Sequence, residues 1–220
     1  MNGLSLFSGG GIGELYLGKL DINIVVANEL IPRRAHLYNT IHRKSNMIIG
    51  DISDKDIYSE IVNSSIKNNI DFIIATPPCQ GFSLVGKNKT TKAIQDDKRN
   101  YLFKYVLDII KDIKPSYILI ENIPRFLKLF IKNKKSHMNP HDYFNSFLGK
   151  DYIVHSDIYN SYDFGVPQDR RRAIIKIYKK GLVWNEPKYS RKKFTLKDAI
   201  GHLPSIESNQ KSNIDWHYGR

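Results

Sequence analysis

Residues 4–14 read Leu4-Ser5-Leu6-Phe7-Ser8-Gly9-Gly10-Gly11-Ile12-Gly13-Glu14, an apolar run followed by a stretch rich in glycine. The apolar run, Leu4–Phe7, predicts a short strand, and we expect a helix around Glu14–Leu20 after the glycines. Glycines between a strand and a helix let the backbone approach a ligand closely. The alternative explanation for this loop is a tight turn.

The same alternation of strands and helices continues along the chain. Further strands are predicted at Ile22–Ala27, Met47–Ile49, Asp71–Ala75, Ser116–Ile120, Tyr152–Ile158 and Ala173–Tyr178. A helix is expected after Pro32, and Asn100–Ile113 carries apolar residues at helical spacing. Lys87–Lys98 and Lys128–Pro140 are basic and are expected to be irregular. The pattern indicates an α/β fold built on a doubly wound, mostly parallel sheet.

Composition narrows the functional class. The chain has 220 residues and a net charge of +12, which suits a polyanionic partner but is also explained by solubility alone. No apolar run approaches the roughly 20 residues that cross a bilayer, and no signal peptide opens the sequence. A single cysteine excludes an internal disulfide. We therefore expect a cytoplasmic protein with no membrane contact.

The single cysteine, Cys79, lies in Ala75-Thr76-Pro77-Pro78-Cys79-Gln80-Gly81-Phe82-Ser83. The apolar run Ile70–Ala75 stops at two prolines, which places the thiol just past the carboxyl end of a predicted strand. In open α/β sheets this edge is where ligands bind. A lone cysteine is more often an inert, buried side chain, so the residue needs support from its neighbours.

Carboxylates end other predicted strands. Glu29 follows Gly9 by twenty residues and is placed to bind ribose hydroxyls, and Asp51 ends the third strand where a base edge can be met. Glu121-Asn122 ends the fifth strand. A glutamate there is suited to general acid work, although a helix cap or a salt bridge explains it equally well.

An arginine-rich run, Gln168-Asp169-Arg170-Arg171-Arg172, precedes the last predicted strand. In an extended segment Gln168, Arg170 and Arg172 would share one face, because side chains alternate. Arginine forks suit phosphates, carboxylates and base carbonyls. A solvated basic turn is the alternative.

Taken together, these motifs resemble those of the cytosine-5 DNA methyltransferase family. The resemblance runs in order from about Leu4 to Ile177 and rests on Phe7-Ser8-Gly9-Gly10-Gly11, Glu29, Asp51, Pro78-Cys79-Gln80, Glu121-Asn122 and Gln168-x-Arg170-x-Arg172. It implies a Rossmann-like, S-adenosylmethionine-dependent methyltransferase fold. It also implies double-stranded DNA as the substrate, from which the target cytosine is flipped out. No metal is implied.

The resemblance assigns roles to individual residues. The implied catalytic residues are Cys79, Glu121, Arg170 and Arg172. The Cys79 thiolate would add at carbon 6 of cytosine, Glu121 would donate a proton to ring nitrogen 3, and Arg172 would hold both the base carbonyl and Glu121 itself. The implied contacts to S-adenosylmethionine are Phe7, Ser8, Gly9, Gly11, Ile12, Glu29, Leu30, Asp51, Ile52, Pro77 and Leu102. The implied contacts to the substrate are Pro78, Gln80, Ser83, Lys87, Asn122 and Gln168.

The sequence departs from the family pattern beyond the arginine motif. Family members continue into a variable target-recognition region and a final conserved segment, which normally packs beside the first strand and helps to complete the cofactor site. Thr195–Pro204 resembles the segment just before that region. We therefore expect a catalytic domain over residues 1–185, and over residues 186–220 an extension that leads towards a missing target-recognition region. A natural subunit completed by a second polypeptide is favoured over a truncated product.

The predicted function is the catalytic subunit of a DNA (cytosine-5) methyltransferase of restriction–modification type. A transfer-RNA cytosine-5 methyltransferase of the same fold is a close alternative, because it would carry the same cysteine, glutamate and arginines. A noncatalytic dinucleotide-binding module is permitted by the glycine loop and Glu29, but it offers no role for Cys79 or Arg172. A scaffold that is inert without a partner is a further possibility.

Overall fold

The computed structural model describes residues 1–78, 97–129, 131–133 and 136–204 of the chain. The chain divides into two compact units, which are described separately below. The first unit comprises residues 1–158 and 172–184, and the second comprises residues 159–171 and 185–220. The domain boundary at residue 185, expected from the sequence, stays a prediction.

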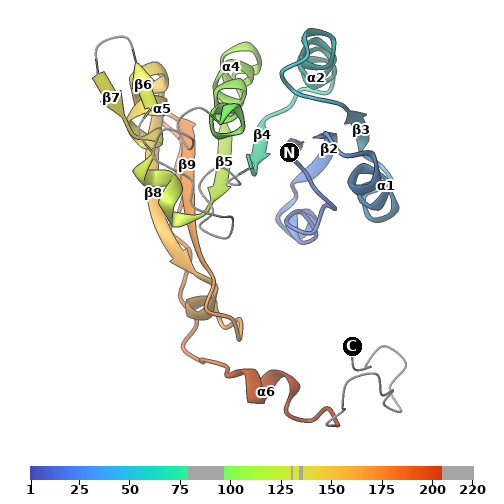
Figure 1. Ribbon diagram of the computed structural model, residues 1–220, viewed down its shortest axis with the longest axis vertical. Coiled ribbons are helices and arrows are strands. Elements are labelled where there is room, and N and C mark those ends of the chain that lie inside the picture. The colour runs from blue at the N-terminus through green and yellow to red at the C-terminus, as the bar shows by residue number, and fades with distance from the viewer. Residues whose placement is uncertain (79–96, 130, 134–135, 205–220) are drawn as a thin grey trace. The chain divides into compact units, whose positions relative to one another are not determined.

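A seven-stranded sheet with the order β3–β2–β1–β4–β5–β9–β8 is the framework of the described chain (Figure 1). The strands are β1 (Asn2–Leu6), β2 (Asn23–Glu29), β3 (Asn46–Ile49), β4 (Phe72–Ala75), β5 (Tyr117–Asn122), β8 (Tyr152–Asn160) and β9 (Arg171–Lys179). Strands β1 to β5 pair in parallel, and β9 runs antiparallel to β5. The doubly wound, mostly parallel α/β fold is confirmed, and each predicted strand has a counterpart.

Helices cover both faces of the sheet (Figure 1). On one face lie α2 (Lys55–Lys67) and α4 (Phe103–Ile113), and on the other lie α1 (Pro32–Ile41) and the 3₁₀ helix η1 (Leu17–Leu20). Their ends follow local rules: Pro32 occupies the first turn of α1, and the Asp54 carboxylate accepts the N–H groups of two residues at the start of α2.

Shorter elements complete the described chain. They are η2 (Lys98–Tyr101), η3 (Pro124–Lys128), β6 (Ile131–Asn133), β7 (Ser136–Met138), α5 (Pro140–Leu148), η4 (Ser161–Phe164) and α6 (Leu196–Ile200). The expectation that Lys128–Pro140 is irregular was wrong, since β6 and β7 form an antiparallel pair there. Ile131 is fully buried, so this pair is anchored in the core despite the basic residues around it.

The prediction of a helix around Glu14–Leu20 was also wrong about the length and type of the helix. Residues 13–16 form turns, and only Leu17–Leu20 are helical, as a single 3₁₀ turn. The apolar side chains of this segment do not form a buried stripe: Leu15, Tyr16 and Leu20 are 46%, 69% and 69% exposed. Without a buried face, a short segment that contains glycines gains too little to remain an α-helix.

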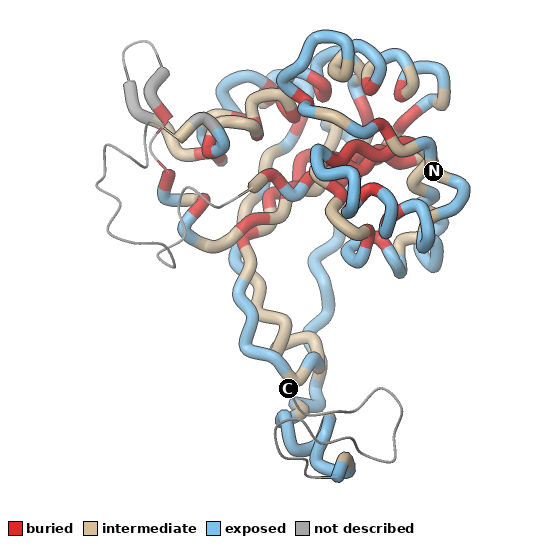
Figure 2. The backbone as a smooth tube through the Cα atoms, turned by 45° about the vertical axis from the view of Figure 1, so that its right-hand side comes forward, coloured by how far each residue is buried: buried red, intermediate tan, exposed pale blue. Residues whose placement is uncertain are grey.

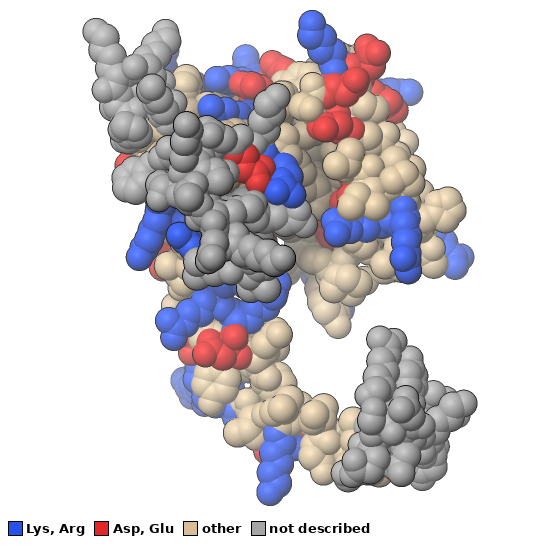
Figure 3. Space-filling model, in the orientation of Figure 1, with Lys and Arg blue, Asp and Glu red and all other residues tan. Residues whose placement is uncertain are grey.

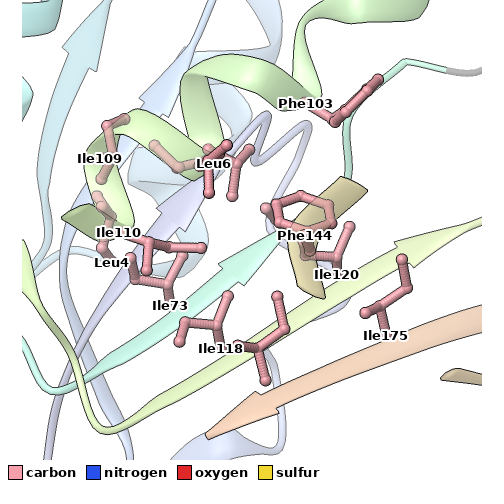
Figure 4. Packing of buried hydrophobic residues seen from close by; sticks show 14 of the residues in the cluster. Leu4, Leu6, Ile73, Phe103, Ile109, Ile110, Ile118, Ile120, Phe144 and Ile175 are labelled. Atoms are coloured by element: carbon pink, nitrogen blue, oxygen red, sulfur yellow. The ribbon is translucent and has the colours of Figure 1, made fainter. Parts of the chain in front are cut away.

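The hydrophobic core lies between the sheet and the helices of the first unit (Figure 2). Strands β1, β4 and β5 contribute side chains such as Leu4, Ile73 and Ile118, which are fully buried. The close view in Figure 4 places these beside Ile110 of α4 and Phe144 of α5. Strand β4, Phe-Ile-Ile-Ala, is buried and apolar on both faces, as expected of a strand covered by helices on each side.

Phe103, at the first turn of α4, packs against aromatic side chains of η3 and α5 within this core. It is 1% exposed, and its ring lies 5.5–5.9 Å from the rings of Phe126, Tyr143 and Phe144. We expect Phe103→Ala to lower the free energy of unfolding by about 3–5 kcal/mol, because the change removes buried surface and leaves a cavity. Urea unfolding followed by far-ultraviolet circular dichroism measures this loss.

Phe147→Ala is the matched control. Phe147 is 45% exposed and packs mainly against the Tyr143 ring at 5.0 Å, so its loss should cost no more than about 1.5 kcal/mol. Equal losses in the two variants would contradict the placement of Phe103 at the centre of the core.

Candidate functional site

The carboxyl ends of the five parallel strands lie at one edge of the sheet, and most of the candidate residues follow them (Figure 1). Ser8 follows β1, Glu29 ends β2, Asp51 follows β3, and Pro77 follows β4, while Glu121 lies near the end of β5. This is the edge at which open parallel sheets bind ligands. The described candidates Ser8, Glu29, Asp51, Pro77 and Glu121 therefore lie along one edge of the sheet, and their roles stay predictions.

The glycine loop after β1 is held in a conformation that only some residues tolerate. Gly9 and Gly11 have φ angles of +58° and +77°, which glycine adopts without a steric penalty. Phe7 also has a positive φ, of +58°, which is uncommon for an aromatic residue and is found at ligand-binding turns. Ser8 anchors the turn, since its N–H and its hydroxyl both donate to the Asn28 carbonyl at 3.1 Å.

Glu29 ties this loop to the end of β2. One carboxylate oxygen accepts the Gly9 N–H at 2.8 Å, and the other accepts the Ile31 N–H at 2.9 Å. Each carboxylate oxygen has a further lone pair, so these bonds do not use up its capacity to accept from a ligand. Glu29 itself is 5% exposed, whereas the neighbouring Leu30 is 56% exposed. The role of both residues in cofactor binding stays a prediction.

Asp51 and Ile52 differ in their surroundings. One Asp51 carboxylate oxygen accepts both the N–H and the hydroxyl of Ser53, at 2.8 and 2.7 Å, and the residue is exposed. Ile52 is 2% exposed and belongs to the hydrophobic core. A cofactor at this edge would therefore meet the Asp51 carboxylate more readily than the Ile52 side chain.

Asn28 is a residue that the sequence analysis missed. It is 2% exposed, and its amide donates to the carbonyls of Ile48 and Gly50 at 3.0 and 3.1 Å. These bonds join the ends of β2 and β3 and so fix the approach to Asp51. A signal was present, because an asparagine directly after the apolar run of β2 needs a hydrogen-bond partner if it is buried.

Glu121 and Arg172 form an ion pair, although they belong to different motifs. Arg172 Nε lies 2.7 Å from Glu121 Oε1, and the two side chains are 24% and 28% exposed. The antiparallel register of β5 and β9, in which Asn122 pairs with Ala173, brings the start of β9 beside the end of β5. The pair fixes both side chains at the sheet edge while leaving them partly open to a ligand.

Asn122 connects β5 to the segment after β4. It is 3% exposed, and its amide donates to the Pro77 carbonyl at 3.0 Å. Thr76 is joined in turn to the loop after β1, because its hydroxyl donates to the Phe7 carbonyl at 2.9 Å. The chain that leads into Pro78 is therefore tied to the glycine loop on one side and to the Glu121 strand on the other.

Gln168 and Arg170 belong to the second unit. The backbone N–H of Arg170 donates to the Asn160 side-chain oxygen at 3.0 Å. The expectation of one extended segment from Gln168 to Arg172 was wrong, because Pro167 and Gln168 form a bend and β9 begins only at Arg171. Strand alternation therefore does not extend back to Gln168. Its side-chain role, like that of Arg170, stays a prediction.

The remaining candidates are placed as follows. Pro77 is buried and Pro78 half-buried; Ile12 is 65% exposed; Leu102 is half-buried at the N-terminus of α4. The candidates Cys79, Gln80, Ser83 and Lys87 lie outside the described residues.

In the part of the chain that the structure covers, no group of three or more His, Cys, Asp or Glu side chains could hold a metal ion. No described helix is long and apolar enough to span a membrane.

A buried polar cluster behind the glycine loop was also missed by sequence reasoning. Glu14 is 6% exposed and accepts a hydrogen bond from the Ser5 hydroxyl. Burial raises the pKa of the Glu14 carboxyl above its ordinary value, and the Ser5 hydrogen bond opposes this shift. Tyr38 is fully buried nearby, and His42 lies against it with ring centroids 4.5 Å apart.

Curated proteins with similar sequences include Type II methyltransferases. The chain is 48% identical to the Type II methyltransferase M1.HgaI of Avibacterium volantium over 220 residues, which cover 99% of this chain and 61% of that protein. It is 31% identical to the Type II methyltransferase M1.HphI of Haemophilus parahaemolyticus, covering 96% of this chain and 55% of that protein. The chain thus spans little more than half the length of these relatives.

Solved structures and a family model agree with this similarity. A prophage-encoded E. coli protein, described as a candidate DNA modification methyltransferase, superposes with a TM-score of 0.71 at 25% identity, covering 97% of this chain and 58% of that one. The family model for C-5 cytosine-specific DNA methylases matches residues 1–220. This chain therefore belongs to the C-5 cytosine-specific DNA methylase family.

Proposed function

We propose that this chain is the catalytic portion of a DNA (cytosine-5) methyltransferase of a restriction–modification system. The observation that carries the proposal is the Glu121–Arg172 ion pair at the carboxyl edge of the sheet. The segment after β4, which leads to Cys79, is held to the same end of β5 by the hydrogen bond from the Asn122 amide to the Pro77 carbonyl. Cys79 follows Pro78 directly in the sequence, and the proposal assigns it the nucleophile beside the proton donor Glu121 and the base-holding Arg172.

Cys79 supplies the nucleophile in this proposal. Carbon 5 of cytosine is too poorly nucleophilic to accept a methyl group unaided. Addition of the Cys79 thiolate at carbon 6 forms an enamine in which carbon 5 becomes nucleophilic. After carbon 5 has gained its methyl group, a water molecule takes up the carbon 5 proton. The electron pair of that C–H bond then re-forms the double bond between carbons 5 and 6, and the thiolate leaves carbon 6.

Glu121 and Arg172 act on the other side of the base. In its acid form Glu121 donates a proton to ring nitrogen 3, which offsets the charge that the thiolate brings to the ring. Arg172 holds the base carbonyl and keeps Glu121 in place through their ion pair. The target base must leave the DNA stack to reach these groups.

S-adenosylmethionine is the proposed methyl donor, and the residues after β1, β2 and β3 fit it. A Cβ on Gly9 would have no heavy atom within 4 Å, so the loop backbone is open to a ligand there. The carboxylates of Glu29 and Asp51 follow on the next two strands. Exposed Leu30 offers an apolar contact for an adenine ring. When bound, the donor supplies an electrophilic methyl group.

DNA is the proposed substrate. Basic residues outnumber acidic ones by 34 to 22 over the chain, which favours a polyanion. Figure 3 shows Lys and Arg side chains spread over the face that it draws, interspersed with acidic ones. The described stretch 185–204 of the second unit is also basic, with Lys188, Arg191, Lys192, Lys193 and Lys197 against Glu186 and Asp198. A cytoplasmic location follows from such a substrate in a bacterial-type system.

Methyl transfer to duplex DNA and to tRNA distinguishes the two related activities. We expect incorporation of labelled methyl groups into duplex DNA at cytosine carbon 5, and none into tRNA. Cys79→Ser should lower this activity by at least about 100-fold while binding of S-adenosylmethionine is retained, because a serine hydroxyl is a far weaker nucleophile at neutral pH. Activity on tRNA alone, or substantial turnover by Cys79→Ser, would contradict the proposal.

Adjacent arginines offer a matched test of the ion pair. We expect Arg172→Ala to lower kcat by about 100-fold or more, because Glu121 loses the partner that orients it. Arg171→Ala is the control, since Arg171 pairs at 3.8 Å with exposed Asp169 and its own side chain is 69% exposed. Its kcat should stay within about threefold of the parent chain. Equal losses of kcat in the two variants would contradict the role of the ion pair and would show that activity depends only on positive charge in this segment.

We also propose that a second polypeptide supplies the target-recognition region and the final conserved segment. Residues 1–185 would then be the catalytic domain, and 186–220 would lead towards that partner. Exposed apolar side chains outside the proposed cofactor contacts support this. They are Tyr16, Leu20 and Leu37, each 52–69% exposed, and we call them the loop-side patch. The loop and α1 are neighbours here, because a Cβ on Gly10 would lie 2.8 Å from Leu37. Large apolar side chains left exposed beside a binding loop favour an interaction site.

Mixing experiments test the partner. We expect the 220-residue chain alone to methylate DNA weakly, and a chain carrying the remaining family segments to restore turnover. Leu37→Asp in the loop-side patch should weaken this restoration by at least about tenfold, because a charge would be buried in an apolar contact. The control is Ile66→Asp, at a position of α2 whose side chain is 55% exposed, and it should leave the restored turnover unchanged. Full activity without any addition would exclude the second polypeptide.

A further inference from the structure

His42, at the C-terminal end of α1, contacts the glycine loop that follows β1. It follows the last turn of α1, and its backbone N–H donates to the Tyr38 carbonyl at 2.7 Å. The His42 Nε2 atom lies 2.7 Å from the Gly11 carbonyl oxygen. A carbonyl oxygen can only accept, so Nε2 must carry a proton in this contact.

The loop backbone fits closely against two aromatic rings. A Cβ added to Gly11 would lie 2.5 Å from His42 Cδ2 and 2.8 Å from Tyr38 Cδ2, distances that real Cβ atoms do not show. The two rings are themselves in contact, with centroids 4.5 Å apart and planes inclined by 32°. Gly11 is therefore required for two reasons, its φ of +77° and the absence of space for a side chain.

The direction of the Gly11 carbonyl decides the direction of the next amide. In a trans peptide the C=O and N–H groups point to opposite sides, so a Gly11 carbonyl bound to His42 turns the Ile12 N–H away from α1. Ile12 itself is 65% exposed, on the open side of the loop. His42 thus sets which way a backbone donor of the loop faces.

Other loop contacts come from the strands. The Ser8 N–H donates to the Asn28 carbonyl, and the Gly9 N–H donates to Glu29. At the far end of the loop, Glu14 accepts from Ser5 of β1. These bonds hold both ends of the turn, and the contact with His42 lies between them at Gly11.

We propose that His42 is a positioning residue for S-adenosylmethionine binding, which acts by holding the Gly11 carbonyl and thereby orienting the loop backbone towards the ligand. This inference rests on the proposed function. His42 lies behind the loop and touches neither Glu121 nor Arg172 among its described contacts, so it acts on binding of the methyl donor and not on the methyl-transfer step.

The test compares His42→Met, which keeps bulk but has no donor, with His42→Gln, whose amide nitrogen can occupy the Nε2 position. We expect His42→Met to raise the Kd for S-adenosylmethionine about tenfold, measured by isothermal titration calorimetry, and His42→Gln to stay within about threefold of the parent. In methylation assays the KM for S-adenosylmethionine should rise in His42→Met while kcat stays within about twofold. His36→Met, on the exposed side of α1, is the matched control and should change neither constant.

The outcomes separate this inference from the proposed function. If the parent chain binds S-adenosylmethionine and His42→Met binds it equally well, the positioning role is wrong while the proposed function stands. If His42→Gln is impaired as much as His42→Met, the hydrogen bond is not the cause and the inference also fails. If the parent chain does not bind S-adenosylmethionine either alone or with the chain that carries the remaining family segments, the proposed function fails and this inference fails with it.

A measurement on the unaltered chain avoids any folding defect in the variants. Long-range ¹H–¹⁵N NMR correlation reports which ring nitrogen of a neutral histidine carries the proton. We expect the proton of His42 on Nε2, and we expect its signals to shift when S-adenosylmethionine is added. A proton on Nδ1 of His42 would overturn the proposal. So would His42 signals that do not shift when S-adenosylmethionine is added.

Discussion

Parallel pairing of β1 with β2 on one side and β4 on the other is the constraint on which the rest of the structure depends. Strands that pair in parallel must be joined by connections that cross back over the sheet, so their carboxyl ends lie at the same edge. Polar residues at these ends lie just beyond the apolar interior of the sheet, where hydrogen-bond partners replace the strand ladder. In this chain Ser8, Glu29 and Asp51 are brought together by that rule, although twenty or more residues separate each from the next.

The polar groups at this edge are held by a continuous set of hydrogen bonds and ion pairs. Glu29 and Asn28 join the loop to β2 and β3, Asn122 joins β5 to Pro77, and Arg172 joins β9 to Glu121. Backbone groups at strand ends lack a ladder partner, and these side chains supply one. The edge is therefore ordered by its own contacts before any ligand is present, which reduces the ordering cost of binding.

The sequence predicted the sheet well because each strand is a short apolar run with a clear end. It failed for residues 14–20, where the apolar side chains are exposed and do not stabilise an α-helix. The grouping of Glu121 with Arg172 was expected from the family resemblance, but their ion pair depends on the register between β5 and β9, which no local pattern reveals. The contacts of Glu14 with Ser5 and of His42 with Gly11 were missed for the same reason: each joins residues that only the fold brings together.

The antiparallel register of β9 has a consequence for how such a chain can vary. Side chains alternate along a strand, so a slip of one residue would turn Arg172 away from Glu121 and present a neighbour on that face. Insertions and deletions within the paired part of β9 are therefore excluded. The part of the β8–β9 connection before Gln168, in contrast, can change in length without moving the ion pair, as long as the strand resumes in phase. Divergence between related chains should accumulate in that part, and the spacing from Gln168 to the end of β9 should stay constant.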